Sequence, residues 1–174
     1  MSPRAVLVGL PGTGKTTTGR RLAKIIAVPF ADSDDLVERD TGRSVGEIFA
    51  ADGEAAFRAA EQAAIVGALR DFDGVLSLGG GALTAAATRA AVEASGVPVV
   101  LLTAAQDTLH SRVGDAASRP LLAADPVARL AQLDRERAPV YHAVATLTVP
   151  TDSRTPGQVA ATIAARLHEM RTRS

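Results

Sequence analysis

Residues 9–16 read Gly-Leu-Pro-Gly-Thr-Gly-Lys-Thr and match the phosphate-binding pattern G-x-x-x-x-G-K-[ST] at every fixed position. Such a loop joins a buried strand to a helix. The neighbouring patterns agree, because Ala5–Val8 is a continuous apolar run and residues 15–26 have helical periodicity. The glycines let backbone N–H groups surround a phosphate at the helix N-terminus. We expect Lys15 to reach the β- and γ-phosphates of a nucleotide and the Thr16 hydroxyl to bind Mg²⁺. The apolar positions predicted for the helix are Leu22, Ile25 and Ile26.

The length and composition restrict the class of protein. At 174 residues the chain suits one domain, residues 1–174, with a core that needs no cross-links. It has no cysteine, and its formal net charge of zero argues against a nucleic-acid partner bound through a broad basic field. No secretory signal pattern or membrane-spanning apolar run is visible, so we expect a cytoplasmic enzyme without a membrane partner. Nothing in the sequence demands more than a monomer.

Strand patterns alternate with helical patterns along the whole chain. This alternation predicts an α/β fold, a five-stranded parallel sheet with helices on both faces, and a ligand at the carboxyl ends of the strands. No repeat, linker or low-complexity segment interrupts the pattern. The last helix begins at Thr155-Pro156, which has the signature of an N-cap and a first-turn proline. We predict strands at residues 4–9, 28–31, 74–78, 97–103 and 144–149, and helices at 15–26, 36–39, 44–51, 54–69, 85–94, 105–113 and from 127.

Candidate functional groups follow the second and third strands. Asp32 and Asp34 could divide the work, one holding water on Mg²⁺ and one orienting an acceptor hydroxyl. Taken alone they are as well explained as helix caps, and Asp35 is expected to be a plain cap. Strand three ends in Gly79–Gly81 and has no terminal aspartate, so a ligand could approach its backbone closely.

The arginines are ambiguous when they are considered one at a time. Arg58 lies between Glu54 and Glu61 at helical spacing, which favours a surface ion-pair ladder. Arg119 falls in a polar segment, residues 114–126, that we interpret as a mobile flap able to bring an arginine to phosphates. Arg135 and Arg137 are expected at the end of a helix, where the dipole favours cations.

Together these segments closely resemble the shikimate kinase family, and in particular its actinobacterial members. The P-loop is common to many enzymes, and the combination with the other motifs is much more specific. The resemblance covers the chain almost end to end. It is carried by residues 9–16, Asp32-Ser33-Asp34, Thr41-Gly42-Arg43-Ser44, Ile48-Phe49, Asp52-Gly53-Glu54, Phe57-Arg58, Glu61, residues 77–82, Arg119-Pro120-Leu121-Leu122 and Arg137-Ala138-Pro139-Val140-Tyr141.

The resemblance implies a P-loop kinase fold and transfer of phosphate from ATP to shikimate, with Mg²⁺ as cofactor. It implies a substrate-binding subdomain at residues 33–61 and a lid at about 112–126. Lys15, Asp34 and Arg119 would be catalytic, with Asp34 as the candidate base, and Thr16 and Asp32 would hold the metal ion. The residues implied for ATP are Gly12, Thr13, Gly14, Lys15, Thr16, Thr17, Arg112, Arg119 and Pro156, and those for shikimate are Asp34, Phe49, Phe57, Arg58, Gly80, Gly81 and Arg137.

Several alternatives are weaker. A gluconate kinase would also need arginines, but it does not predict the aspartate pair together with Gly79–Gly81 and Arg137-Ala138-Pro139-Val140-Tyr141. A GTP-dependent switch would need an Asn-Lys-x-Asp guanine reader, and the chain contains no asparagine. A structural protein with a vestigial loop would not need Lys15 in a chain with only one other lysine, Lys24.

Overall fold

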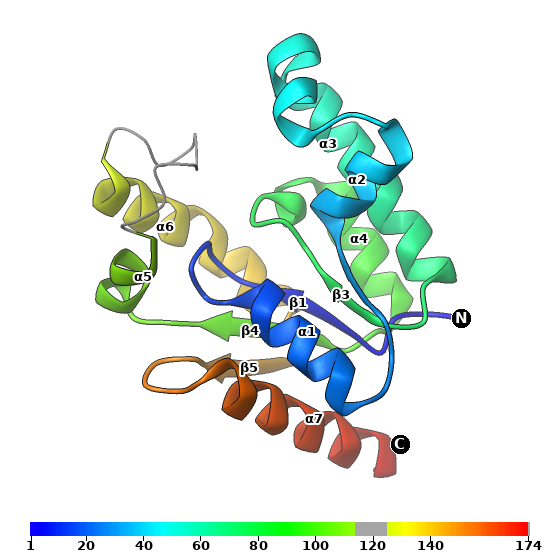
Figure 1. The fold of residues 1–174 in the computed structure, drawn as a ribbon, viewed down its shortest axis with the longest axis vertical. Helices are drawn as coiled ribbons and strands as arrows, with labels where there is room; N and C mark the ends of the chain where they lie inside the picture. The colour runs from blue at the N-terminus through cyan, green and yellow to red at the C-terminus, as the bar shows by residue number, and fades with distance from the viewer. Residues whose placement is uncertain (114–124, 174) are drawn as a thin grey trace.

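A five-stranded parallel sheet forms the centre of the computed structural model, which describes residues 1–113 and 125–173 (Figure 1). Each strand is short, and those in the middle of the sheet are apolar on both faces, as expected when helices cover a parallel sheet on both sides. The register places Leu7 opposite both Ser77 and Val100. In spatial order the strands are β2 (Phe30–Asp32), β3 (Val75–Ser77), β1 (Ala5–Val8), β4 (Val99–Thr103) and β5 (Leu147–Pro150).

Helices pack on both faces of this sheet and form one hydrophobic cluster on each face. Alternate side chains along the central strands belong to different clusters. Leu7 packs with residues of α1 (Lys15–Ile25) and α7 (Pro156–Thr172), which lie side by side on one face (Figure 1). Val6 and Val8 face the other cluster. That larger cluster draws on α2 (Ser33–Thr41), α3 (Val45–Asp71), α4 (Ala86–Ser95), α5 (Gln106–Val113), α6 (Pro126–Val144) and the short 3₁₀ helix η1 (Ala82–Thr84). The predicted three-layer α/β/α fold is confirmed.

The two helix breaks predicted at Gly42 and Gly53 have different outcomes. The predicted break at Gly53 is a kink inside α3 and not the end of a helix, with φ 84° and ψ 177° at the glycine. The predicted break at Gly42 is a left-handed C-cap of α2, with φ 68°. The predicted apolar face of α1 is partly wrong, because Ile25 is 52% exposed while Leu22 is fully buried.

Cap and helix-end assignments also need correction. Asp35 is not the cap of α2, because Asp32 occupies the N-cap position and its carboxylate accepts the Asp34 N–H. The helix expected to end near Arg135 and Arg137 continues to Val144. Pro139 lies inside it, and the helix tolerates the lost backbone donor. The predicted N-cap Thr155 and first-turn Pro156 of α7 are confirmed. No described helix is both long and apolar enough to cross a membrane.

Candidate active site

The phosphate loop adopts a backbone that requires its glycines. Gly12 and Gly14 have φ angles of 87° and 85°, in the left-handed region that favours glycine. Gly14 is the N-cap of α1, so the free N–H groups of the helix begin directly after the loop. Lys15 folds back over the loop, with Nζ donating to the carbonyl of Gly9 at 2.8 Å and that of Leu10 at 3.2 Å. This is the geometry of a phosphate cradle with an ammonium group at its mouth.

A cavity of about 250 Å³ adjoins the loop on the side of β5 and α7. Arg112 of α5 joins its walls, because its guanidinium donates to the carbonyl of Gly12 at 3.2 Å and to Oγ1 of Thr151 at 2.9 Å. Five residues predicted for ATP therefore come together here, namely Gly12, Thr13, Gly14, Arg112 and Pro156. Thr17 is not among the residues that line this cavity; it lines a groove on the outer face of α1. Arg154 also lines the cavity and was missed, because the irregular segment 151–156 gave no pattern that pointed to it.

The residues predicted for a metal ion lie in contact. Thr16 Oγ1 donates to Asp32 Oδ2 at 3.3 Å, while Oδ1 of the same carboxylate caps α2. No cluster of three or more His, Asp or Glu side chains in residues 1–113 and 125–173 could hold a metal by itself. Mg²⁺ in P-loop enzymes needs fewer protein ligands, since phosphates and water complete its shell. Thr16 and Asp32 fit that donor set.

Two carboxylates and one guanidinium meet beside Gly79. A Cβ atom built on Gly79 would lie 2.8 Å from Glu61 Oε1 and 3.1 Å from Asp34 Oδ1. Arg58 binds Glu61 Oε2 at 2.5 Å, and Glu61 is only 2% exposed. A Cβ atom on Gly81 would overlap the Arg58 guanidinium. The Glu54 contact exists at 3.7 Å, but the surface-ladder interpretation of Arg58 is wrong because its side chain faces the Gly79–Gly81 backbone.

The protonation of these carboxylates is shifted. Burial raises the pKa of Asp34, the nearby Asp32 charge raises it further, and the Arg58 cation opposes both effects. Burial also raises the pKa of Glu61, again against the influence of Arg58. Oε1 of Glu61 has no hydrogen-bond partner among the described residues. Arg58 thus lowers the pKa of two carboxylates whose neutral forms are favoured by burial.

A second arginine reaches the same glycines from α6. A Cβ atom on Gly80 would lie 2.8 Å from Arg137 Nη1. One helical turn further on, the Tyr141 hydroxyl donates to the Gly80 carbonyl at 2.5 Å. Arg137 is 9% exposed, so it is not a surface cation that merely complements a helix dipole. Arg58 and Arg137 therefore line one backbone segment from two different helices.

Comparison with known proteins agrees with this arrangement. A family model for shikimate kinase matches residues 11–168. The chain is 48% identical over 168 residues to a shikimate kinase of Mycobacterium tuberculosis, covering 96% of this chain and 94% of that one. It is 50% identical over 167 residues to a shikimate kinase of Salinispora tropica, covering 96% and 99%. The chain belongs to the shikimate kinase family.

Solved structures of shikimate kinases have the same fold as this chain. The shikimate kinase of Acinetobacter baumannii, solved in complex with shikimate, matches with a TM-score of 0.89 and 33% identity, over 97% of this chain and 94% of that one. A gluconokinase of Sinorhizobium meliloti matches with a TM-score of 0.66 at 18% identity, over 97% and 93%, and shows a shared fold alone. The chain is a kinase, a transferase, with the P-loop kinase fold of this family.

Two phenylalanines predicted for the shikimate pocket pack together next to Arg58. The ring centroids of Phe49 and Phe57 are 4.7 Å apart with a tilt of 35°, and the Arg58 guanidinium lies 5.1 Å from the Phe57 ring. This contact orients the guanidinium toward the glycine segment. Arg119, predicted to contact phosphates, lies outside the described residues, as does most of the predicted lid.

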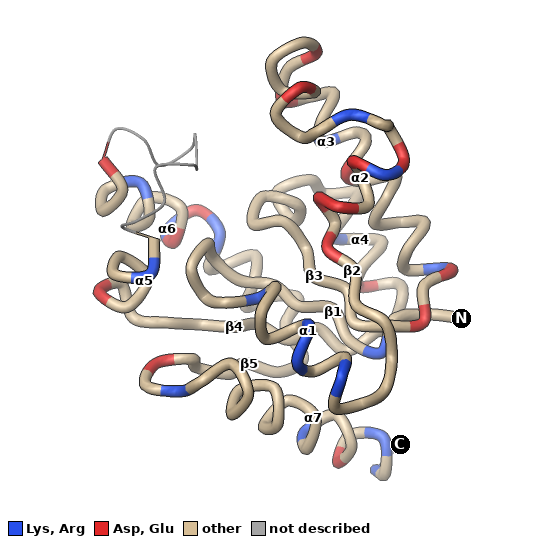
Figure 2. Tube along the Cα trace, viewed as in Figure 1, with Lys and Arg blue, Asp and Glu red and all other residues tan. Residues whose placement is uncertain are grey.

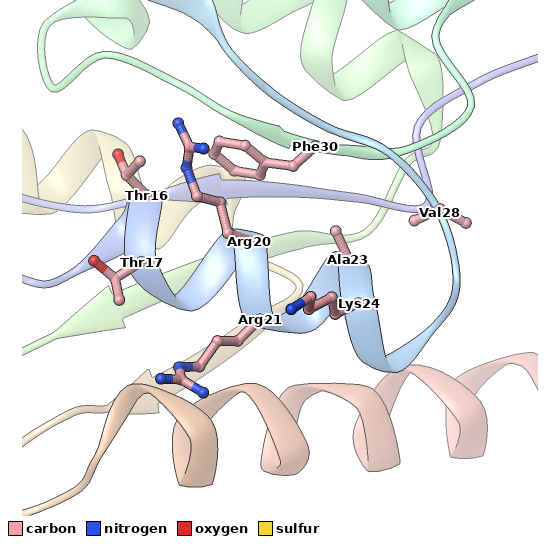
Figure 3. Close-up of a pocket in the computed structure, with 8 residues that line it drawn as sticks. All are labelled: Thr16, Thr17, Arg20, Arg21, Ala23, Lys24, Val28 and Phe30. Atoms are coloured by element: carbon pink, nitrogen blue, oxygen red, sulfur yellow. The ribbon is translucent and has the colours of Figure 1, made fainter.

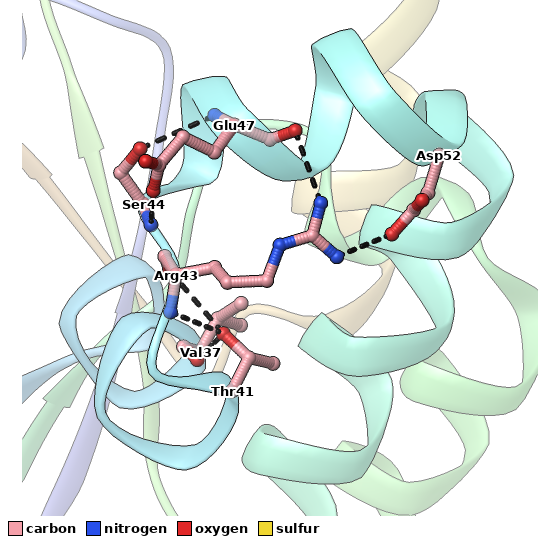
Figure 4. A network of polar contacts seen from close by, with 6 residues as sticks. All are labelled: Val37, Thr41, Arg43, Ser44, Glu47 and Asp52. Atoms are coloured by element: carbon pink, nitrogen blue, oxygen red, sulfur yellow. Dashed lines mark hydrogen bonds and ion pairs between the residues drawn. The ribbon is translucent and has the colours of Figure 1, made fainter.

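The corner between α2 and α3 is held by a polar network that the sequence did not predict (Figure 4). Ser44 and Glu47 form a capping box at the start of α3. Arg43 binds Asp52 at 2.5 Å and donates to the Glu47 carbonyl at 3.3 Å. The network crosses from the α2–α3 connection to the residue before the Gly53 kink, and so fixes the tip of α3 that carries Phe49.

Proposed function

We propose that this chain transfers the γ-phosphate of ATP to a hydroxyl of shikimate, giving shikimate 3-phosphate for the synthesis of aromatic amino acids. The observation that carries the proposal is the approach of Arg58 and Arg137 to Gly80 and Gly81, with Asp34 beside them. Two guanidinium groups from separate helices, each able to donate paired N–H bonds, suit the single carboxylate of a small polyhydroxylated acid. The cytoplasm, where ATP is abundant, is the proposed location, and a monomer is the proposed active form.

Asp34 has the position and chemistry of the general base. Its carboxylate lies 3.1 Å from a Cβ atom built on Gly79, near where the acceptor hydroxyl would be held by the glycine backbone. A raised pKa makes the carboxylate a stronger proton acceptor, and the Arg58 charge limits that rise. The proton of the shikimate hydroxyl would move to Asp34 as the hydroxyl oxygen attacks the γ-phosphorus of ATP.

The phosphate loop and the start of α1 would bind the phosphates of ATP. Lys15 and the loop N–H groups would neutralise negative charge on the transferring phosphoryl group. Thr16 and Asp32 would hold Mg²⁺, which neutralises charge on the β- and γ-phosphates when bound. Arg112 and Pro156 would flank the adenine in the cavity beside the loop.

Residues 33–61 are proposed as the substrate-binding subdomain and residues 112–126 as the lid. Residues 114–124 lie outside the described part of the chain, so the role of Arg119 rests on resemblance. If Arg119 acts on the transferring phosphoryl group, Arg119→Ala lowers kcat by about 100-fold or more and changes the KM for shikimate little. A near-normal kcat for this variant would remove Arg119 from the proposed machinery.

A coupled assay of ADP release tests the function directly. ATP, Mg²⁺ and shikimate should give turnover, while gluconate in place of shikimate, or omission of Mg²⁺, should not. Lys15→Ala should lower kcat by about 100-fold or more and keep the circular dichroism spectrum, because Lys15 is not part of either hydrophobic cluster. Turnover with gluconate but not with shikimate would overturn the substrate assignment. Unchanged turnover in folded Lys15→Ala would overturn the loop assignment.

A further inference from the structure

A groove of about 570 Å³ runs along the outer face of α1, with the segment 28–30 forming one wall (Figure 3). Three cations line it, Arg20, Arg21 and Lys24, together with the hydroxyls of Thr16 and Thr17. No carboxylate is among its described lining residues. Arg58, Arg137 and Lys15 do not line the groove, while Thr16 and Thr17 form the end where it meets the phosphate loop.

The three cations lack compensating charges. None of them takes part in an ion pair within residues 1–113 and 125–173. Arg20 and Lys24 are four residues apart on one helix, a spacing at which like charges destabilise the helix. Figure 2 shows basic residues along α1 and acidic ones at the end of β2 and the start of α2. An anion in the groove would relieve this repulsion.

Arg20 contacts an aromatic ring at one wall of the groove. Its guanidinium lies 5.3 Å from the centroid of the Phe30 ring. The ring itself is pressed against α1 at Gly19, where a Cβ atom would overlap it. A guanidinium held on an aromatic face is already oriented before a ligand arrives, so less side-chain entropy is lost on binding.

Arg21 occupies the other side of the groove. Figure 3 shows Arg20 beside Phe30 and Arg21 directed toward α7, with Lys24 on the same helix one turn further on. The stem of Arg21 reaches the first turn of α7, where a Cβ atom on Gly157 would lie 3.9 Å from Arg21 Cδ. The two guanidinium groups therefore point to different sides of the groove, one beside Phe30 and one toward α7.

We propose that this groove is a second anion site, which binds a small molecule carrying two charged groups, either a phosphate and a carboxylate or two carboxylates. Each guanidinium would bind one group through paired N–H donors, and Lys24 would add a point charge. The site does not depend on the proposed substrate, because none of its cations contacts the Gly79–Gly81 segment.

Isothermal titration calorimetry tests the site, using protein saturated with ADP, Mg²⁺ and shikimate so that the catalytic sites are filled. The probes are 3-phosphoglycerate, succinate and sulfate at constant ionic strength. The two-group anions should bind with one site per chain, and sulfate should bind at least about tenfold more weakly. Arg20→Gln and Arg21→Gln should each weaken binding by about tenfold or more, the usual loss for a charge-assisted pair.

A charge-matched control distinguishes binding at a specific site from non-specific electrostatic attraction of anions to the protein. The triple variant Arg20→Gln, Arg21→Gln, Lys24→Gln should lose at least about 100-fold in affinity. The triple variant Arg70→Gln, Arg166→Gln, Arg173→Gln removes the same charge from exposed positions outside the groove and should stay within about twofold of the parent. Absence of saturable binding to the parent, or equal weakening in both triple variants, would overturn the proposal. Sulfate binding as tightly as 3-phosphoglycerate would overturn the two-group assignment.

Discussion

At the scale of single residues, the chemistry of the site depends on how charge is balanced around Asp34. Its pKa is raised by burial and by Asp32, and Arg58 works against both. A general base must be ionised to accept a proton, so activity should fall as the pH drops through this raised pKa. Arg58 consequently has two tasks, since it would bind the substrate carboxylate and also limit the rise in the pKa of Asp34.

The first prediction concerns the pH profile. Arg58→Ala removes the charge that lowers the pKa of Asp34, so the acid limb of the kcat/KM profile should move to higher pH. Initial rates between pH 5 and 9 in the ADP-release assay measure this shift. Arg43→Ala removes a half-buried arginine of the α2–α3 corner that has no part in the pKa shift of Asp34, and it should leave the limb in place. An acid limb that does not move in Arg58→Ala would mean that Asp34 is not the titrating base.

Stability should respond to Asp34 in the opposite sense to activity. A carboxyl whose pKa is raised by folding binds more protons in the folded state, so its contribution to stability falls as the pH rises from its usual range through the raised pKa. Asp34→Asn should therefore be inactive and more stable at pH 7, with the gain vanishing near pH 3. A gain of about 1 kcal/mol corresponds to a Tm increase of about 2–4 °C, measurable by calorimetry. A lower Tm at pH 7 would contradict this view of the site.

The two arginines should act on shikimate and not on ATP. Arg58→Ala and Arg137→Ala should each raise the KM for shikimate by about tenfold or more, because a charge-assisted pair contributes about 1.5–3 kcal/mol. Arg137→Lys should restore only part of the loss, since an ammonium cannot form the paired contact. Arg135→Ala is the matched control on the exposed side of the same helix. Normal shikimate KM values in both alanine variants would remove these arginines from the site.

At the scale of elements, the turn after β3 shows why three glycines follow that strand. None of Gly79, Gly80 and Gly81 has a positive φ, so conformational freedom is not the requirement. The missing Cβ atoms leave room for Glu61, Asp34, Arg137 and Arg58 to reach the backbone. The close approach seen here is made by the protein's own side chains, and the approach of a ligand to this backbone stays a prediction.

Substitution of these glycines should therefore act through the arginines. Gly81→Ala should displace the Arg58 guanidinium and Gly80→Ala should displace Arg137, and each should raise the KM for shikimate by about tenfold. Gly67→Ala is the contrasting change, since Gly67 lies within α3 with open space around its Cα. It should leave the kinetics unaltered and stabilise the fold by about 0.5–1 kcal/mol. Steady-state kinetics and thermal melting distinguish the two classes.

The sequence predicted what depends on local pattern and missed what depends on tertiary contact. The loop, the parallel sheet and the Thr155 cap follow from residue type and spacing. Arg137 could not be placed inside α6, because Pro139 normally signals the end of a helix. Arg58 was assigned to the surface because its neighbours at helical spacing are acidic, and the packing that buries Glu61 is not visible in sequence. Only the family resemblance pointed to both arginines as ligands.

At the scale of the whole molecule, the proposed shikimate site joins parts that are far apart along the chain. Asp34 and Arg58 come from α2 and α3, while Arg137 comes from α6. A ligand that binds only the folded form adds about 2.7 kcal/mol of stability at 100 times its Kd. Shikimate at that concentration should raise the Tm by roughly 5–10 °C, and gluconate should not. If Arg137→Ala loses the Tm increase caused by shikimate and keeps the one caused by ADP, the shikimate effect arises at this site.

Tyr141 determines the intrinsic fluorescence of the protein, because it is the only tyrosine in a chain without tryptophan. Its hydroxyl is bonded to the Gly80 carbonyl, one helical turn from Arg137. All tyrosine fluorescence of the protein therefore originates at a single known point beside the proposed shikimate carboxylate. The emission of the native chain can report occupancy of that point without an attached dye, and a change in the hydrogen bond to Gly80 becomes an optical signal.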